Sequence, residues 1–165
     1  MHVLIDPAPA LVVSEWLNVD VPPTLAALRG EVVVIEAFQM LCPGCVSHGL
    51  PQAQRIQSAF GRDLVVLGLH TVFEHHAAMT PVSLAAFLHE YRITFPVAVD
   101  APVPGDAIPA TMRRYGLRGT PSLLVVDRGG RLRISPFGSA DDLAVGAALA
   151  RLIDEPAPTS QETRA

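Results

Sequence analysis

The only two cysteines of this 165-residue chain are Cys42 and Cys45, separated by Pro43 and Gly44. They follow the apolar run VVVI at residues 32–35 and precede an expected helix. A strand that leads into C-x-x-C at a helix start places the first thiol over unpaired backbone N–H groups. Together with the helix dipole, those groups stabilise a thiolate. Because the second cysteine follows one turn later, a short disulfide ring can close, as reversible thiol–disulfide exchange requires.

Two other interpretations of the cysteine pair remain open. The cysteines could be structural, although structural pairs are seldom spaced as C-x-x-C at a strand–helix junction. They could also bind a metal ion together with distant histidines. A zinc site, however, needs about four ligands, and the chain has no second C-x-x-C. The sequence therefore favours redox chemistry.

The composition excludes several classes of function. The net charge of −4 provides no basic surface for nucleic acid, and no apolar stretch is long enough to span a membrane. The N-terminal residues lack the basic and long apolar regions of a secretory signal. We therefore expect a cytoplasmic protein, or a periplasmic one if a leader has been removed. Length and hydrophobic content predict one domain over residues 1–155, followed by a disordered tail over residues 156–165.

Hydrophobic runs and turn residues predict an α/β protein in which strands alternate with helices, with a mixed central sheet. A short edge strand or turn is expected near residues 14–18, and a short helix over residues 24–28. The expected strands cover residues 31–38, 63–71, 95–100, 121–127 and 131–136, the last two joined by a hairpin turn. The expected helices cover residues 43–60, with a kink at Pro51, and residues 82–91, 110–115 and about 139–153.

Two segments resemble the thioredoxin-like superfamily. Residues 32–46, VVVIEAFQMLCPGCV, resemble its active-site strand and helix, and residues 119–122, GTPS, with the hairpin that follows, resemble its cis-proline loop. The stretch between them is similar to the insertion of TlpA/ResA-type and peroxiredoxin-like members, the redoxin and AhpC/TSA-like proteins. The resemblance implies a thioredoxin-like fold, with helices flanking the mixed sheet, an N-terminal extension and a central insertion.

The candidate catalytic residues are the two cysteines, Glu36 and Pro121. Cys42 is expected to attack a substrate disulfide, and Cys45 to resolve the mixed disulfide. Glu36 is a lone acid in an apolar strand, where burial is costly. It is either the general base for Cys45, as the matching acid of thioredoxins implies, or an exposed or salt-bridged acid. Pro43 and Gly44 lie between the cysteines and are expected to take part in substrate binding.

The resemblance implies a cis peptide bond before Pro121. Such a bond would turn the Thr120 backbone toward the disulfide, where a substrate chain could pair with it. The alternative is an ordinary trans proline that begins a strand. Two positions depart from the family pattern. Leu41 stands where many members have Trp, and Gln39 stands where peroxiredoxins have Thr or Ser.

The histidines after the second predicted strand have no assigned role. His70 is expected near the same sheet edge as Cys42. There it could stabilise a thiolate or bind copper with the cysteines, or it could cap a solvated loop. His75 and His76 follow in the same segment.

The leading hypothesis is a thiol–disulfide oxidoreductase that exchanges with protein thiols and disulfides and receives electrons from a dithiol protein. No cofactor or metal is implied. The alternatives are a thiol peroxidase, which would be an antioxidant enzyme, and a copper-handling thioredoxin-like protein.

Overall fold

A seven-stranded mixed sheet forms the centre of the molecule in the computed structural model, which describes residues 2–157. The strand order is β1-β7-β6-β3-β4-β5-β2. The inner strands are β3 (Val32–Phe38), β4 (Leu64–His70), β5 (Val97–Asp100), β6 (Ser122–Val126) and β7 (Leu132–Ile134), and the edge strands are β1 (His2–Ile5) and β2 (Val13–Leu17). The central strand β3 runs parallel to β4 and antiparallel to β6. This mixed sheet is the predicted architecture.

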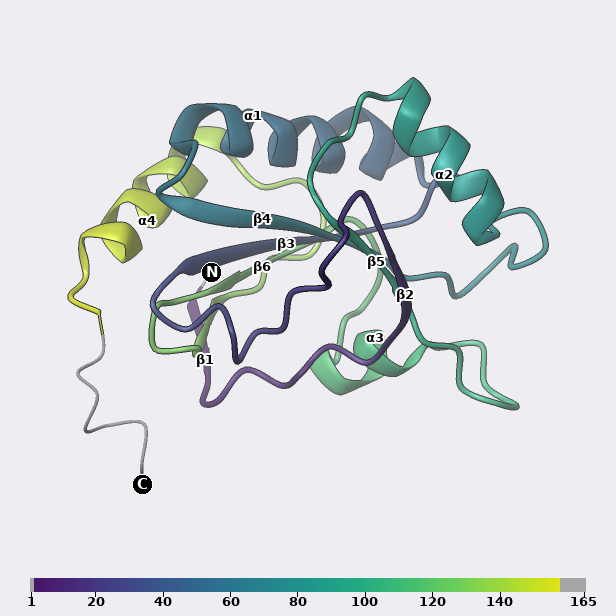
Figure 1. Cartoon of the computed structure of the whole chain (residues 1–165), viewed down its shortest axis with the longest axis horizontal. Helices are drawn as coiled ribbons and strands as arrows, with labels where there is room; N and C mark the ends of the chain where they lie inside the picture. The colour runs from purple at the N-terminus through teal and green to yellow at the C-terminus, as the bar shows by residue number, and fades with distance from the viewer. Residues whose placement is uncertain (1, 158–165) are drawn as a thin grey trace.

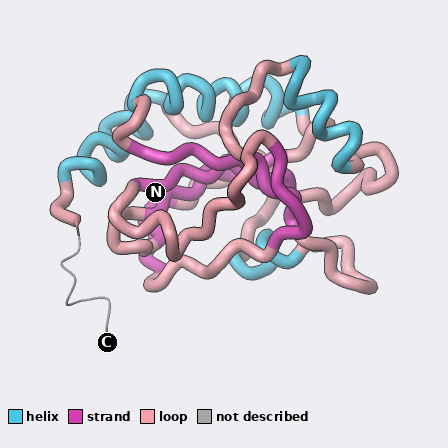
Figure 2. Tube along the Cα trace, in the orientation of Figure 1, coloured by secondary structure: helices cyan, strands magenta, loops and turns pink. Residues whose placement is uncertain are grey.

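Helices cover the two faces of the sheet unequally. The helical segments are η1 (Cys45–Gly49), α1 (Leu50–Phe60), α2 (Pro81–Glu90), α3 (Ala110–Tyr115) and α4 (Asp142–Asp154). Figure 1 shows α1, α2 and α4 over one face and α3 on the other. Figure 2 shows that loops cover much of the face that α3 shares. None of the helices within residues 2–157 has the length and apolar character needed to cross a bilayer.

The alternation of side chains along β3 separates two hydrophobic cores. Val32, Val34 and Phe38 pack in the core beneath α1 and α4, whereas Val33, Ile35 and Ala37 pack in the core on the opposite face. Because side chains two positions apart point to the same face of a strand, Glu36 points toward the helices together with Val34 and Phe38. The strand therefore aims one carboxyl group at the helix that carries the cysteines.

The helix after Cys42 contains a π-helical turn before Pro51. The Leu50 N–H donates to the Cys45 carbonyl, five residues earlier, within η1. Proline has no N–H for the normal helical bond to the fourth preceding carbonyl, and the wider turn occurs just before it. The structure therefore has a π turn over Cys45–Gly49, just before Pro51, and the kink expected at Pro51 itself stays a prediction.

The N-terminal segment differs in part from expectation. The edge strand near residues 14–18 is confirmed as β2, but β1 was not predicted. The helix predicted over residues 24–28 is wrong, because this stretch forms only turns. The Leu28 N–H donates to the Thr24 carbonyl and Gly30 has φ 94°, so one helical bond forms before the chain turns away. Most of the predicted disordered tail, residues 158–165, lies outside the described residues, and the single domain over residues 1–155 stays a prediction.

Candidate active site

The two cysteines lie at the carboxyl end of β3, where the chain enters the helix. Both are free thiols; Cys42 is partly exposed and Cys45 is buried. The backbone N–H of Cys45 donates to the Cys42 sulfur at 3.2 Å. The Cys42 thiol faces the Thr120 carbonyl oxygen at 3.5 Å. The sulfur of Cys42 thus has both the helix N–H contact and the solvent access that an attacking thiolate needs.

The loop that carries Pro121 lies directly against the cysteine pair. The Thr120–Pro121 peptide bond is cis. A Cβ atom at Gly44 would lie 3.2 Å from Pro121 Cδ, tighter than most contacts between real side chains. Glycine between the cysteines therefore allows the proline ring to approach the helix start. Sequence positions 42–45 and 120–121 are thereby brought together, as the resemblance implies.

Burial distinguishes the second cysteine from the first. It raises the pKa of the Cys45 thiol to about 12, and a hydrogen bond with Cys42 adds to the increase. At pH 8 only about one Cys45 in ten thousand would then be ionised. Cys45 therefore needs a proton acceptor before it can act as a nucleophile.

Glu36 is a buried carboxyl group on β3, the strand that leads to the cysteines. Its side chain is 1% exposed, and its Oε1 has no hydrogen-bond partner among the described residues. Burial raises the pKa of this carboxyl well above its ordinary value, and the negative charge of Cys42 adds to the increase. Glu36 is neither exposed nor salt-bridged: it is buried on the central strand and forms no ion pair with any residue in 2–157.

Gly49 is a site residue that sequence reasoning missed. A Cβ atom there would overlap Glu36 Oε1 and would lie 2.8 Å from Pro121 Cβ. Its backbone has ordinary helical angles, φ −59° and ψ −59°, so glycine is needed here for space and not for conformation. The sequence did contain one signal for this role, since Gly49 lies inside a predicted helix. A glycine there costs stability, and a common reason to keep one is that another group packs closely against the helix backbone.

Gly49→Ala is therefore expected to destabilise the protein by about 2 kcal/mol, because the added methyl group overlaps two packed groups. Denaturant unfolding measures the change. Gly146→Ala in α4 is the matched control, since no atom lies within 4 Å of a Cβ built there. Removing this helical glycine should stabilise the protein by about 0.5–1 kcal/mol. Equal effects of the two variants would contradict the steric argument.

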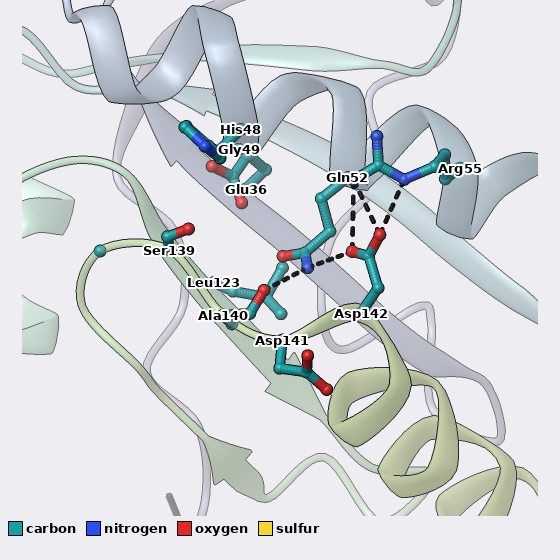
Figure 3. Close-up of a pocket in the computed structure, with 11 residues that line it drawn as sticks. Glu36, His48, Gly49, Gln52, Arg55, Leu123, Ser139, Ala140, Asp141 and Asp142 are labelled. Carbon is teal, nitrogen blue, oxygen red and sulfur yellow. Dashed lines mark hydrogen bonds and ion pairs between the residues drawn. The ribbon is translucent and has the colours of Figure 1, made fainter.

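Behind Glu36 lies a polar pocket of about 370 Å³, which was also not predicted. Figure 3 shows Glu36, Gly49 and His48 on one side of it and the start of α4 on the other. Gln52 Nε2 donates to the Ala140 carbonyl at 2.9 Å and to Asp142 Oδ1 at 2.7 Å. Arg55 forms an ion pair with Asp142 at 3.0 Å. These bonds hold the helix α1 to the start of α4 along one wall of the pocket.

Gln39 has a structural role in this arrangement. It is buried; its Oε1 accepts from the Phe73 N–H at 3.2 Å, and its Nε2 donates to Glu74 at 3.4 Å. The amide thus holds the loop after β4 against the chain between β3 and Cys42. Of the two residues that follow Gln39, Met40 is buried and only Leu41, 58% exposed, contributes an apolar surface.

His70 lies at the end of β4, opposite Phe38 of β3, and is buried. Its ring lies 5.3 Å from that of Phe38, and within residues 2–157 neither ring nitrogen has a hydrogen-bond partner. The alternative of a capping histidine in a solvated loop is wrong. His75 and His76 are exposed. Among residues 2–157, no group of three His, Cys, Asp or Glu side chains is arranged to hold a metal ion.

The burial of His70 predicts instability in acid. Burial lowers the pKa of His70 from 6.5 to about 4. The folded state therefore resists protonation, and the stability present above pH 6.5 is lost as the pH falls toward 4. The maximum loss is about 3 kcal/mol, from a shift of about 2.5 pKa units. The free energy of unfolding, measured with urea between pH 7 and pH 4, should depend less on pH in His70→Phe than in the unchanged protein. The exposed control His89→Gln should keep the pH dependence of the unchanged protein. The same pH dependence in His70→Phe as in the unchanged protein would count against this assignment.

The fold and the cysteine pair define a thioredoxin-like protein, and the comparisons with known proteins agree. The structure of a thioredoxin-like superfamily protein is 59% identical, with a TM-score of 0.90, over 92% of this chain and 99% of that protein. A thiol–disulfide isomerase from Corynebacterium glutamicum is 50% identical, with a TM-score of 0.86, over 92% of this chain and 100% of that protein.

A curated relative, Protein DipZ of Mycobacterium tuberculosis (strain CDC 1551 / Oshkosh), is 27% identical over 149 residues. The alignment covers 88% of this chain and 20% of DipZ, so the chain spans about a fifth of the length of the curated relatives it matches. No family model matches the chain. From the two solved structures, the chain belongs to the thioredoxin-like superfamily.

Proposed function

We propose that the protein exchanges dithiols and disulfides with protein partners through the Cys42–Cys45 pair. One observation carries the proposal: a partly exposed thiol receives a helix N–H at 3.2 Å while its partner three positions on is buried. An exposed nucleophile beside a protected resolving thiol is the arrangement that two-step exchange requires.

The reaction would proceed through a mixed disulfide. The Cys42 thiolate attacks one sulfur of a substrate disulfide, and the other substrate sulfur leaves as a thiolate. Cys45 then loses its proton to the Glu36 carboxylate and attacks the Cys42 sulfur, which releases the second substrate thiolate. Two electrons pass to the substrate, and the protein is left with a Cys42–Cys45 disulfide. A dithiol electron donor would restore both thiols.

Glu36 suits this sequence because its electrostatic environment changes during the reaction. The charge of Cys42 contributes to the raised pKa of Glu36. Once the Cys42 sulfur is in a mixed disulfide it carries no charge, and this contribution disappears. Glu36 therefore ionises most easily at the stage at which Cys45 needs a base.

The surface around Cys42 favours a polypeptide partner. Leu41 and Phe137 are 58% and 48% exposed, and Phe137 packs against Gly119 in the loop that precedes Pro121. Exposed apolar side chains beside an attacking thiol suit a partially folded or extended chain. The Thr120 backbone would pair with that chain, with Pro43 and Gly44 beside it. The identity of the partner and the cytoplasmic location stay predictions.

Three assays separate the proposed function from its alternatives. Reduction of insulin disulfides, coupled to a dithiol donor, should be efficient. Oxidation by hydrogen peroxide should be slow, because Gln39 stands where peroxiredoxins have a hydroxyl side chain and is engaged with Phe73 and Glu74. Fast peroxide consumption with poor insulin reduction would favour the peroxidase, and tight copper binding with poor exchange would favour the copper-handling protein. The reduction potential of the cysteine pair would then indicate the direction of electron flow.

A further inference from the structure

The pocket behind Glu36 is separate from the face on which a substrate would meet Cys42. Glu36 and His48 both line it, whereas neither cysteine does. Glu36 lies at its buried end, with Oε1 unpartnered, and His48 is exposed. The carboxyl that faces the cysteine helix is therefore also the inner wall of a cavity that reaches the surface.

The pocket has the size and lining that water needs. Its volume of about 370 Å³ exceeds the space of a single water many times over. Carboxylates, an amide, a guanidinium and backbone carbonyls border it, so a water molecule inside would find several polar partners. A chain of waters from Glu36 to the surface is consistent with both properties.

The contacts of the Ser47 hydroxyl favour one tautomer of His48. The Ser47 hydroxyl donates its single proton to the Pro43 carbonyl at 2.8 Å. It can then only accept at its 2.6 Å contact with His48 Nδ1. The proton of the neutral imidazole therefore lies on Nδ1, and Nε2 is left with a free lone pair. In this tautomer His48, which lines the pocket, accepts a proton at Nε2.

We propose that this pocket is the proton path of Glu36, and that His48 passes protons between its water and bulk solvent. The proposal rests on the proposed function. After Glu36 takes the proton of Cys45, the carboxyl gives it to a pocket water, which gives it to His48 Nε2, and the imidazolium releases it to solvent. No electron moves in these steps. His48 acts through water and is a relay, not a residue that touches the substrate.

The other charged groups of the pocket do not compete for this role. Asp142 is bonded to Arg55 and Gln52, and Asp141 accepts from the Ala144 N–H as the cap of α4. These groups come from α1 and α4, and Glu36 comes from β3. His48, on η1, is the one histidine that lines the pocket within the described part of the chain.

The test follows the lifetime of the mixed disulfide. Reduced full-length protein is mixed with a peptide disulfide in weakly buffered solution, quenched in acid and analysed by mass. In His48→Ala the mixed disulfide should persist about tenfold longer than in the unchanged protein. Added imidazole should restore the rate, and the effect should vary with pH between 6 and 9. His89→Ala, an exposed histidine of α2, is the control and should match the unchanged protein.

Two results would overturn the relay. One is an unchanged lifetime in His48→Ala across the pH range, and the other is a longer lifetime that imidazole does not shorten. Failure of the proposed function has a different signature, because the unchanged protein would then form no mixed disulfide at all. Formation of the mixed disulfide at normal rates in both variants, with slower resolution in His48→Ala alone, supports both proposals.

Discussion

Cys42→Ser should reduce disulfide exchange to background, because it removes the only thiol that is both exposed and bonded to a helix N–H. Cys45→Ser should instead accumulate the mixed disulfide, since attack at Cys42 remains and resolution does not. Insulin reduction measures the first effect, and mass spectrometry of the trapped complex measures the second. The two variants are matched, because each replaces one sulfur by oxygen within the same turn.

Alkylation provides an independent check on the different reactivities of the two cysteines. Limiting iodoacetamide at pH 8 should label Cys42 almost exclusively, because Cys45 is buried and the pKa of its thiol is raised to about 12. Preferential labelling of Cys45, or trapping of complexes by Cys42→Ser, would reverse the assigned order of the two thiols.

Glu36→Gln should slow resolution of the mixed disulfide by about a hundredfold, the lower range for loss of a general base. Attack by Cys42 should be little changed, so the mixed disulfide would accumulate. The resolution rate of the unchanged protein should rise with pH as the carboxyl ionises, because burial raises the pKa of Glu36. The variant should lose this dependence. Rapid acid quench across pH measures both rates.

The same variant should change the pH dependence of stability. Because the pKa of Glu36 is raised in the folded state, the stability that it contributes at low pH is lost as the pH rises above its ordinary value of 4.5. Glutamine cannot ionise, so Glu36→Gln should be more stable than the unchanged protein at alkaline pH. Equal resolution rates together with equal stability at pH 9 would show that Glu36 is neither a base nor a buried ionisable group.

The sequence predicted the parts of the fold and site that depend on local pattern or family resemblance. The β-branched run of β3, the C-x-x-C after it and the GTPS loop predicted which strand, helix start and loop would meet. The turn at residues 24–28 was mispredicted as a helix, because local propensity does not show that the chain leaves after one helical bond.

What sequence could not supply was contact between distant residues. The residues next to His70 in the sequence are compatible both with a histidine that caps a loop and with one that packs against Phe38. The register of β4 against β3 decides between these two environments. The pocket behind Glu36 likewise joins α1 to the start of α4, about ninety positions later. No local pattern near Glu36 or His48 indicates that the start of α4 lies beside them.

The antiparallel pairing of β6 with β3 means that the active site is assembled late during synthesis. Ser122 pairs with Ala37, and Thr120 meets Cys42 across 78 positions. A nascent chain that ends before residue 119 carries both cysteines but has neither the Thr120 carbonyl nor the Pro121 ring beside them. Such a chain cannot form the contact between the Cys42 thiol and the Thr120 carbonyl. The complete set of contacts around Cys42 therefore forms only after synthesis has passed β6 and β6 has paired with β3.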